Sequence, residues 1–501
     1  MFCQLVYLRG CLPGRIRRTL SELPETLDDT YARTLEEIDK KNWEYAHRLF
    51  QCVAAASRPL NVNELAEFLA FDFEAGSTPS LLADWRPEDP EHCVLSICSS
   101  LLSVVKPDGG SPVVQFAHFS VKEYLTSTRL TKAKDTISRF HVSMTVAHTI
   151  VAQACLGVLL HFDENTTEDS LEEFPLAEYA AEHWVGHARI ENVASKVQEG
   201  TKRLFDPSKS HFLVWVWIYD LEYPRPRSER SKSPEKAKAT PLHYAASCGM
   251  YDVVKFLIVE HSQDVSARGF RDEETPLHVA SRRGHADVTQ LLLENDADLK
   301  AKAQKGFYKR TPLLLASGEG HVEVARVLLE HGSDTETRDD NDWSPLELAS
   351  DGGHVEVTRV LLEHGADVKA KDRYNRTLLH YVKGEELTRL FLKHVVDANA
   401  MDADRRTPLH CASDVGRVGT VRALLEHGVD ANARDAQNMT ALHLASYSGQ
   451  LDSVRLLLQH GADIHARDDE GQTPFMKATK GGDHEIMKLL LEFGAEDHRK
   501  L

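Results

Sequence analysis

The sequence TPLHVASRRGHADVTQLLLENDADL, residues 275–299, decides the architecture of the second half of this chain. A close variant, TALHLASYSGQLDSVRLLLQHGADI, returns at residues 440–464. Starts of this kind recur every 30 to 36 residues, at Thr240, Thr275, Thr311, Ser344, Thr377, Thr407, Thr440 and Thr473. Self-similarity at this period predicts a stack of repeated units instead of one globular core.

Each unit predicts a pair of helices. A Thr hydroxyl caps the first helix, and Pro in its first turn lacks only an N–H that would be unpaired there. In seven units a Gly follows nine residues after the start, as Gly284 follows Thr275, where it ends the helix in a left-handed conformation. A leucine run such as Leu291-Leu292-Leu293 forms the second helix, and an Ala-Asp stretch leads into a projecting loop, here called a finger.

These motifs closely resemble the ankyrin repeat, and the resemblance covers about eight units between residues 239 and 501. It implies an α-helical solenoid that binds other proteins on the concave surface formed by its fingers and first helices. The fifth unit departs from the pattern, because Gly384 follows Thr377 after only seven residues and Val395 replaces the second Gly. We therefore expect a weak point around residues 377–406.

The N-terminal half has no repeat, but its elements are readable. Apolar spacing predicts a helix through Tyr31, a second at residues 45–56, a third at 62–70 and a fourth at 91–101. Residues 103–106 and 113–116 flank Pro107-Asp-Gly-Gly110, which is typical of a hairpin. The helices from residue 45 onward and the hairpin follow one another in the order of a winged-helix domain.

Four stretches of this half, LPETLDDTYARTLEEI, RPLNVNELAEFLA, QFAHFSVKEYL and PLAEYAAEHWVGHAR, resemble the segment after the NTPase in fungal NACHT–ankyrin proteins, relatives of NOD-like receptors. The resemblance implies the tail of a NACHT module at 1–45, a winged helix at 46–130 and a helical connector at 131–220. An exposed linker rich in Pro, Ser and charge follows at 221–238, before the repeats at 239–501. The expected fold is therefore mainly α.

The sequence departs from that family in one decisive respect. It has no GxxxxGK[ST] phosphate loop, so no nucleotide cofactor is expected. Two interpretations stay open: a protein-binding scaffold, or the regulatory and sensing half of an ATP-gated switch whose NTPase is missing from this chain. Pairing with full-length NACHT relatives also stays open. In related switch ATPases, a histidine at the position of His118 senses the phosphates of the nucleotide. The alternative is that His118 only fixes the corner between a strand and a helix.

Composition excludes several other functions. A net charge of −18 disfavours nucleic acid, and the helix at 91–101 contains no Lys or Arg. Eight cysteines without a CxxC pair indicate neither a zinc site nor a disulfide framework, and His183 and His187 lack the Glu of HExxH. No apolar run is long enough to span a membrane, and no catalytic constellation stands out. We expect a non-enzymatic cytoplasmic protein without metal.

The fingers contain the best candidates for contacts with a partner protein. Aromatic and Arg residues are the usual anchors of interfaces, and they occur in four successive fingers. The candidates are Phe270, Phe307, Tyr308, Arg310, Trp343, Arg373 and Tyr374. The alternative is that each ring packs over its own finger.

Overall fold

The computed structural model describes residues 27–74, 78–98, 100–107, 110–224, 226, 237, 239–270, 272–303, 309–394 and 396–496. The chain divides into two compact bodies. The N-terminal body runs to Cys248 and includes Asp252–Gln263, and the C-terminal body comprises Gly249–Tyr251 and the chain from Asp264 onward.

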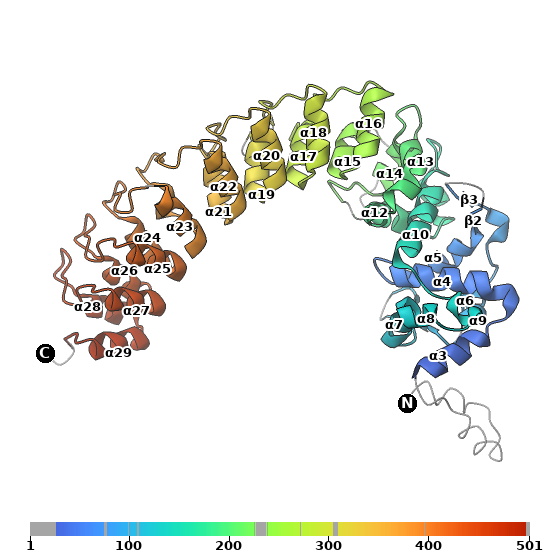
Figure 1. Cartoon of the computed structure of the whole chain (residues 1–501), viewed down its shortest axis with the longest axis horizontal. Helices are drawn as coiled ribbons and strands as arrows, with labels where there is room; N and C mark the ends of the chain where they lie inside the picture. The colour runs from blue at the N-terminus through green and yellow to red at the C-terminus, as the bar shows by residue number, and fades with distance from the viewer. Residues whose placement is uncertain are drawn as a thin grey trace, which may run out of the picture. The chain divides into compact units, whose positions relative to one another are not determined.

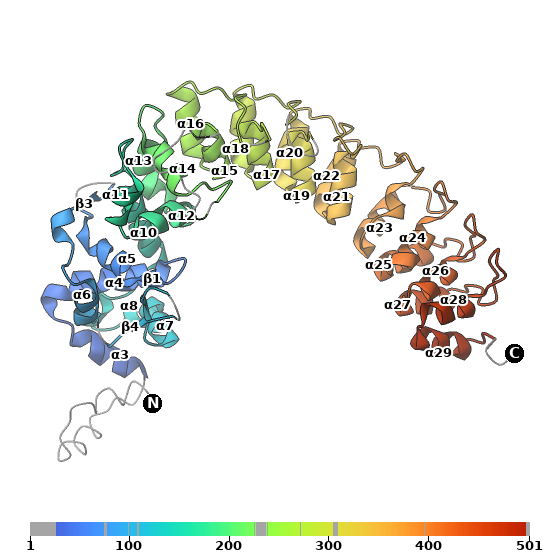
Figure 2. The same cartoon turned by 180° about the vertical axis from the view of Figure 1, so that it is seen from behind.

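The winged helix predicted from the sequence is confirmed in the N-terminal body. Its helices are α4 (Trp43–Ala55), α5 (Val62–Glu67) and α6 (Pro90–Cys98), and its hairpin is formed by β4 (Leu102–Val105) and β5 (Val113–Phe116). The short strand β1 (Leu60–Asn61) pairs antiparallel with β5, which gives a sheet of order β1-β5-β4 (Figure 2). The hairpin tip at residues 108–109 lies outside the described residues.

Shorter elements surround this core. They are α3 (Leu27–Glu36), η1 (Lys40–Asn42), η2 (Phe68–Ala70), β2 (Phe71–Asp72), β3 (Ser80–Leu81), η3 (Ala83–Trp85), α7 (Phe119–Thr126), α8 (Thr128–Thr131) and α9 (Asp135–Ser138). The face of α3 predicted to be apolar is buried at Tyr31 and Leu35.

A helical connector follows, centred on α10 (Met144–Leu159), which packs against α4, α12 (Ala177–Ala188) and α13 (Ala194–Phe205). It also contains α11 (Glu168–Glu172) and α14 (His211–Ile218). Most of the second half of α10 is buried, including Val151, Cys155 and Leu159. Among the residues that the structure describes, no helix is both long and apolar enough to cross a bilayer.

The connector covers the beginning of the first repeat. Phe212 and Trp215 of α14 pack against Tyr244 on α15 (Pro241–Ser247), with ring centroids 5.3 and 6.0 Å apart. The Trp215 indole donates to the Ala181 carbonyl at 2.9 Å, and the Tyr244 hydroxyl donates to Asp220 at 3.0 Å. A repeat cannot bury both of its faces alone, so these aromatic contacts give the first repeat the neighbour it needs. Most of the predicted linker at 221–238 lies outside the described residues.

From α17 (Pro276–Arg283) onward the repeats of the C-terminal body form a row of helix pairs joined by fingers (Figure 1). The pair of the first repeat is α15 and α16 (Tyr251–Val259), in the N-terminal body. We call the first helix of each repeat the inner helix and the second the outer helix. The inner helices of the C-terminal body are α17 (Pro276–Arg283), α19 (Pro312–Glu319), α21 (Pro345–Gly352), α24 (Pro408–Val415), α26 (Ala441–Tyr447) and α28 (Pro474–Gly481). The outer helices are α18 (Ala286–Glu294), α20 (Val322–Glu330), α22 (Val355–Glu363), α23 (Glu385–Lys393), α25 (Val418–Glu426), α27 (Leu451–Gln459) and α29 (His484–Glu492).

The predicted glycine caps are confirmed. Gly284, Gly320, Gly353, Gly416 and Gly482 end their inner helices with φ between 74° and 80°, a region that side chains with a Cβ rarely adopt.

The fifth repeat is shortened, as its sequence predicts. Its inner helix is reduced to the three-residue 3₁₀ turn η5 (Leu378–His380), whereas the other inner helices have seven or eight residues. Gly384 then starts α23 at a φ of 102°. Val395, the other irregular position, lies outside the described residues.

We expect the fifth repeat to open more readily than the sixth. A 3₁₀ turn has fewer backbone hydrogen bonds than a two-turn helix, so local opening costs less free energy. Hydrogen–deuterium exchange of the full chain should therefore be roughly tenfold faster across η5 and α23 than across α24 and α25, equivalent to ~1.4 kcal/mol. Equal protection of the two repeats would contradict this expectation.

Candidate functional site

At four junctions, neighbouring repeats are joined by a histidine three residues after the starting Thr. In each case Nδ1 accepts from the backbone N–H of that Thr at 3.1 or 3.2 Å. The Nε2 atom lies 3.1 or 3.2 Å from a backbone carbonyl in the next finger. Because a carbonyl only accepts, Nε2 must donate, which fixes the neutral tautomer with a proton on Nε2. The bridges are His278 to Arg310, His380 to Arg406, His410 to Met439 and His443 to Gln472.

Burial keeps these histidines neutral. It lowers the pKa of His278 to about 4, and it also lowers the pKa of His380, His410 and His443. The periodic histidines therefore have a structural role, as their register in the sequence suggests.

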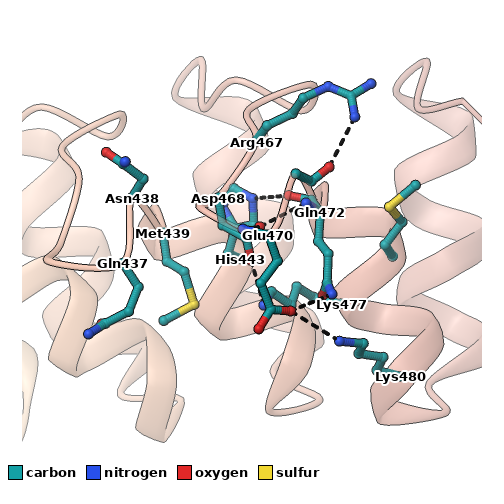
Figure 3. Close-up of polar contacts among 12 residues, drawn as sticks. Gln437, Asn438, Met439, His443, Arg467, Asp468, Glu470, Gln472, Lys477 and Lys480 are labelled. Carbon is teal, nitrogen blue, oxygen red and sulfur yellow. Dashed lines mark hydrogen bonds and ion pairs between the residues drawn. The ribbon is translucent and has the colours of Figure 1, made fainter.

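Figure 3 shows the regular junction between the last two repeats. There Asp468 accepts the backbone N–H groups of Glu470 and Gln472 at 3.0 and 2.7 Å, and Lys477 lies 2.6 Å from its other oxygen. Burial raises the pKa of Asp468, but the contacts with Lys477 and the backbone outweigh it and hold that pKa below its usual value. The carboxylate thus shapes its own finger and is fully occupied.

The junction between the fourth and fifth repeats is built differently. Glu347 stands where other repeats have the bridging histidine, and it is 6% exposed. Its Oε2 accepts from the Ser344 backbone N–H at 2.6 Å and from Arg338 at 3.1 Å. A carboxylate cannot donate to the next finger, so the next repeat must supply the donor. It does so through Tyr381, whose hydroxyl donates to Glu347 Oε1 at 3.3 Å.

Tyr381 begins a chain of aromatic and Arg side chains on the adjoining fingers. Its ring centroid lies 6.2 Å from that of Trp343. The Arg376 guanidinium lies 5.9 Å from the Tyr381 ring and 5.1 Å from the Tyr374 ring, and Arg373 lies 5.1 Å from Tyr374. We call these five residues the Trp343–Tyr374 surface. Contacts of this kind between cations and rings hold both partners in place.

The surface has a buried side and an exposed side. Burial raises the pKa of Tyr381, which is consistent with a hydroxyl held against Glu347. Tyr374 is 50% exposed, and Arg373 is exposed beside it. Trp343 is half-buried. Rigid, partly exposed aromatic rings with an adjacent Arg are typical anchors of protein interfaces.

The structure places the predicted candidates unequally. It brings Trp343, Arg373 and Tyr374 together, although they come from two fingers. Phe270 is 7% exposed, so its ring belongs to the core and not to an exposed surface. Arg310 is held by Asp339 at 3.2 Å. Phe307 and Tyr308 lie outside the described residues.

Sequence reasoning missed Glu347 and Tyr381. The signal for Glu347 was available, because it occupies a repeat position at which five other repeats have a histidine. Tyr381 gives a weaker signal, because the first repeat also has a tyrosine, Tyr244, at the same position.

His118 caps α7 at an exposed corner. Its Nδ1 accepts from the Ser120 backbone N–H at 3.3 Å and lies 2.5 Å from the Ser120 hydroxyl. This contact supports the interpretation of a histidine that fixes the strand-to-helix corner; a role in nucleotide sensing stays a prediction from the resemblance.

His187, one of the two histidines tested above as a metal ligand, lies in the interior and contacts a third histidine, His148. The buried ring of His187 meets the Tyr179 hydroxyl and His148 Nδ1, each at 2.9 Å, and burial lowers its pKa to about 4. Across the described parts of the chain, no group of three or more His, Cys, Asp or Glu side chains is placed to hold a metal ion.

Family models match both halves of the chain. The model for the winged helix domain of GPI inositol-deacylase matches residues 32–138. The ankyrin repeat model matches residues 225–303, 300–372 and 377–468, and a single-repeat ankyrin model matches 470–500.

Several known proteins are similar to parts of this chain. The azaphilone pigments biosynthesis cluster protein L of Monascus ruber is 32% identical over 295 residues, which is 56% of this chain and 61% of that protein. The vegetative incompatibility protein HET-E-1 of Podospora anserina is 24% identical over 244 residues, or 44% of this chain and 17% of that protein. Alpha-latrocrustotoxin-Lt1a of Latrodectus tredecimguttatus is 42% identical over 65 residues, 13% of this chain and 4% of the toxin. The chain thus spans less than two thirds of each.

The bridging histidines make stability depend on pH. Their folded pKa values lie below the unfolded value of 6.5, so acid adds protons preferentially to the unfolded chain. The free energy that the neutral histidines contribute to folding is fully present above about pH 7 and is lost as the pH falls toward their folded pKa. Urea unfolding should show a loss over this range of up to roughly 3 kcal/mol from His278, whose folded pKa is about 4.

Two Asn variants provide the check. H443N should reduce the pH dependence because it removes one bridge. H460N changes the same residue type at an exposed position and is the control. An unaltered pH dependence in H443N would show that the bridge does not titrate as described.

Proposed function

We propose that this chain, a winged-helix domain followed by ankyrin repeats, is a protein-binding scaffold whose partner docks on the Trp343–Tyr374 surface. Ankyrin repeats suggest protein–protein interaction as the general role. The observation that carries the choice of surface is the replacement of the histidine bridge by Glu347 and Tyr381. Departures from a locally consistent pattern are expected at functional sites, where another requirement has overridden the regular packing.

The proposal is tested by a double substitution of the two rings. Capture of partner proteins by the full chain should fall at least about tenfold in W343A/Y374A, because the variant removes both aromatic anchors. Captured proteins would be quantified by mass spectrometry against the unchanged chain. The melting temperature should shift by only a few degrees, since Tyr374 is 50% exposed and Trp343 is half-buried.

A matched control separates a specific loss from a general loss of aromatic surface. W85A/Y45A removes the same two residue types from the N-terminal body, where Trp85 is 52% and Tyr45 is 40% exposed. Capture should survive in this control. Equal capture by W343A/Y374A and the unchanged chain would remove this surface from consideration.

A second function is supported by the N-terminal half. Similarity to HET-E-1 and the winged-helix match favour the regulatory and sensing half of a NACHT-type signalling switch whose NTPase is missing from this chain. An antibody against the repeats distinguishes the two functions by the size of the natural protein. A band near 56.2 kDa would support the scaffold, and a much larger band would support the switch.

A further inference from the structure

The carboxylates that belong to the Trp343–Tyr374 surface are already occupied. Asp372 accepts the backbone N–H groups of Tyr374 and Arg376, both at 2.9 Å, and its other oxygen binds the Arg376 side chain at 2.7 Å. Burial raises the pKa of Asp372, but the bonds with Arg376 and the backbone outweigh it, so the group stays ionised. Glu347 accepts from three donors. These carboxylates have little capacity left for a cationic ligand.

The three carboxylates of the preceding finger that lie closest to Trp343 in the sequence have cationic partners as well. Asp339 accepts two backbone N–H groups, those of Asn341 at 2.9 Å and Trp343 at 3.1 Å, and Arg310 on its other oxygen. The exposed Asp340 lies 3.4 Å from Lys309, and Asp342 lies 3.8 Å from Arg338.

The donors that remain are on the Tyr374 finger. Within the described part of the chain, Arg373 contacts only the Tyr374 ring, and Lys369 and Lys371 have no carboxylate partner. The Trp343 indole N–H likewise has no acceptor among the described residues. The next finger contributes exposed Asp397 and Asp404 against exposed Arg405, so it adds no uncompensated cation. The uncompensated chemistry of this surface is therefore cationic and hydrogen-bond donating, on a chain with a net charge of −18.

We propose that the partner of this surface presents an acidic, extended segment, whose carboxylates bind Arg373 and Lys371 and whose apolar side chains pack on Trp343 and Tyr374. Arg forms strong, directional hydrogen bonds with carboxylates, and a complementary charge speeds association. The inference rests on the proposed function, since it names the chemistry of the partner at the same surface.

Selection from a random library of displayed 12-residue peptides against the full chain tests this inference. The peptides retained by the unchanged chain should be richer in Asp and Glu than the starting library. A retained peptide, synthesised with a fluorescent label, should bind K371E/R373E at least about tenfold more weakly in an anisotropy titration. K196E/K209E is the matched control: it makes the same change in net charge at exposed lysines of the N-terminal body and should bind as the unchanged chain does.

The outcomes distinguish this inference from the function on which it rests. If the retained peptides are not enriched in Asp and Glu, the inference of an acidic partner segment is overturned. If those peptides nevertheless fail to bind the W343A/Y374A variant, the proposed protein-binding surface still stands. Acidic peptides that bind K371E/R373E as tightly as the unchanged chain would also overturn it. Acidic peptides whose binding is lost in K371E/R373E and kept in K196E/K209E would support it.

Discussion

A hydrogen bond from a neutral imidazole to the carbonyl of the next finger is the constraint on which much of the repeat stack depends. It is short-range and directional, and it joins each repeat only to its neighbour. The same ring accepts from its own starting Thr, so one side chain both caps a helix and fixes the spacing to the next repeat. Two further histidines bind backward, His321 to the Arg282 carbonyl and His354 to the Gly318 carbonyl, each at 3.0 Å. The interior of the stack is thus tied together largely by imidazole rings that bond to backbone carbonyls.

The Trp343–Tyr374 surface lies at a junction where Glu347 takes the place of that histidine. Glu347 keeps the capping role of the histidine but reverses the direction of hydrogen bonding toward the next repeat. Tyr381 supplies the missing donor, and its ring then gives Trp343 and Arg376 a surface to pack on. At this junction a change from donor to acceptor therefore accompanies the gathering of aromatic and Arg side chains.

Much of this fold is readable in the sequence, because the interactions are local and repeated. The positions of the inner helices follow from Thr-Pro starts and glycine caps, and the three helices and hairpin of the winged helix follow from apolar spacing. The assembly of Trp343 with Tyr381 did not follow, because it depends on how adjacent fingers lie against each other. Phe270 illustrates the reverse error: a ring in a finger was expected to be exposed, but this ring is buried.

The packing of Phe212 and Trp215 on Tyr244 sets the boundary at which this protein can be divided. The Pro- and Ser-rich stretch at 221–238 looks like the natural place to separate the two halves. A cut there would leave a cluster of large rings facing water on one fragment and an uncovered first repeat on the other. A fragment that keeps these rings covered therefore has to contain the connector together with the first repeat.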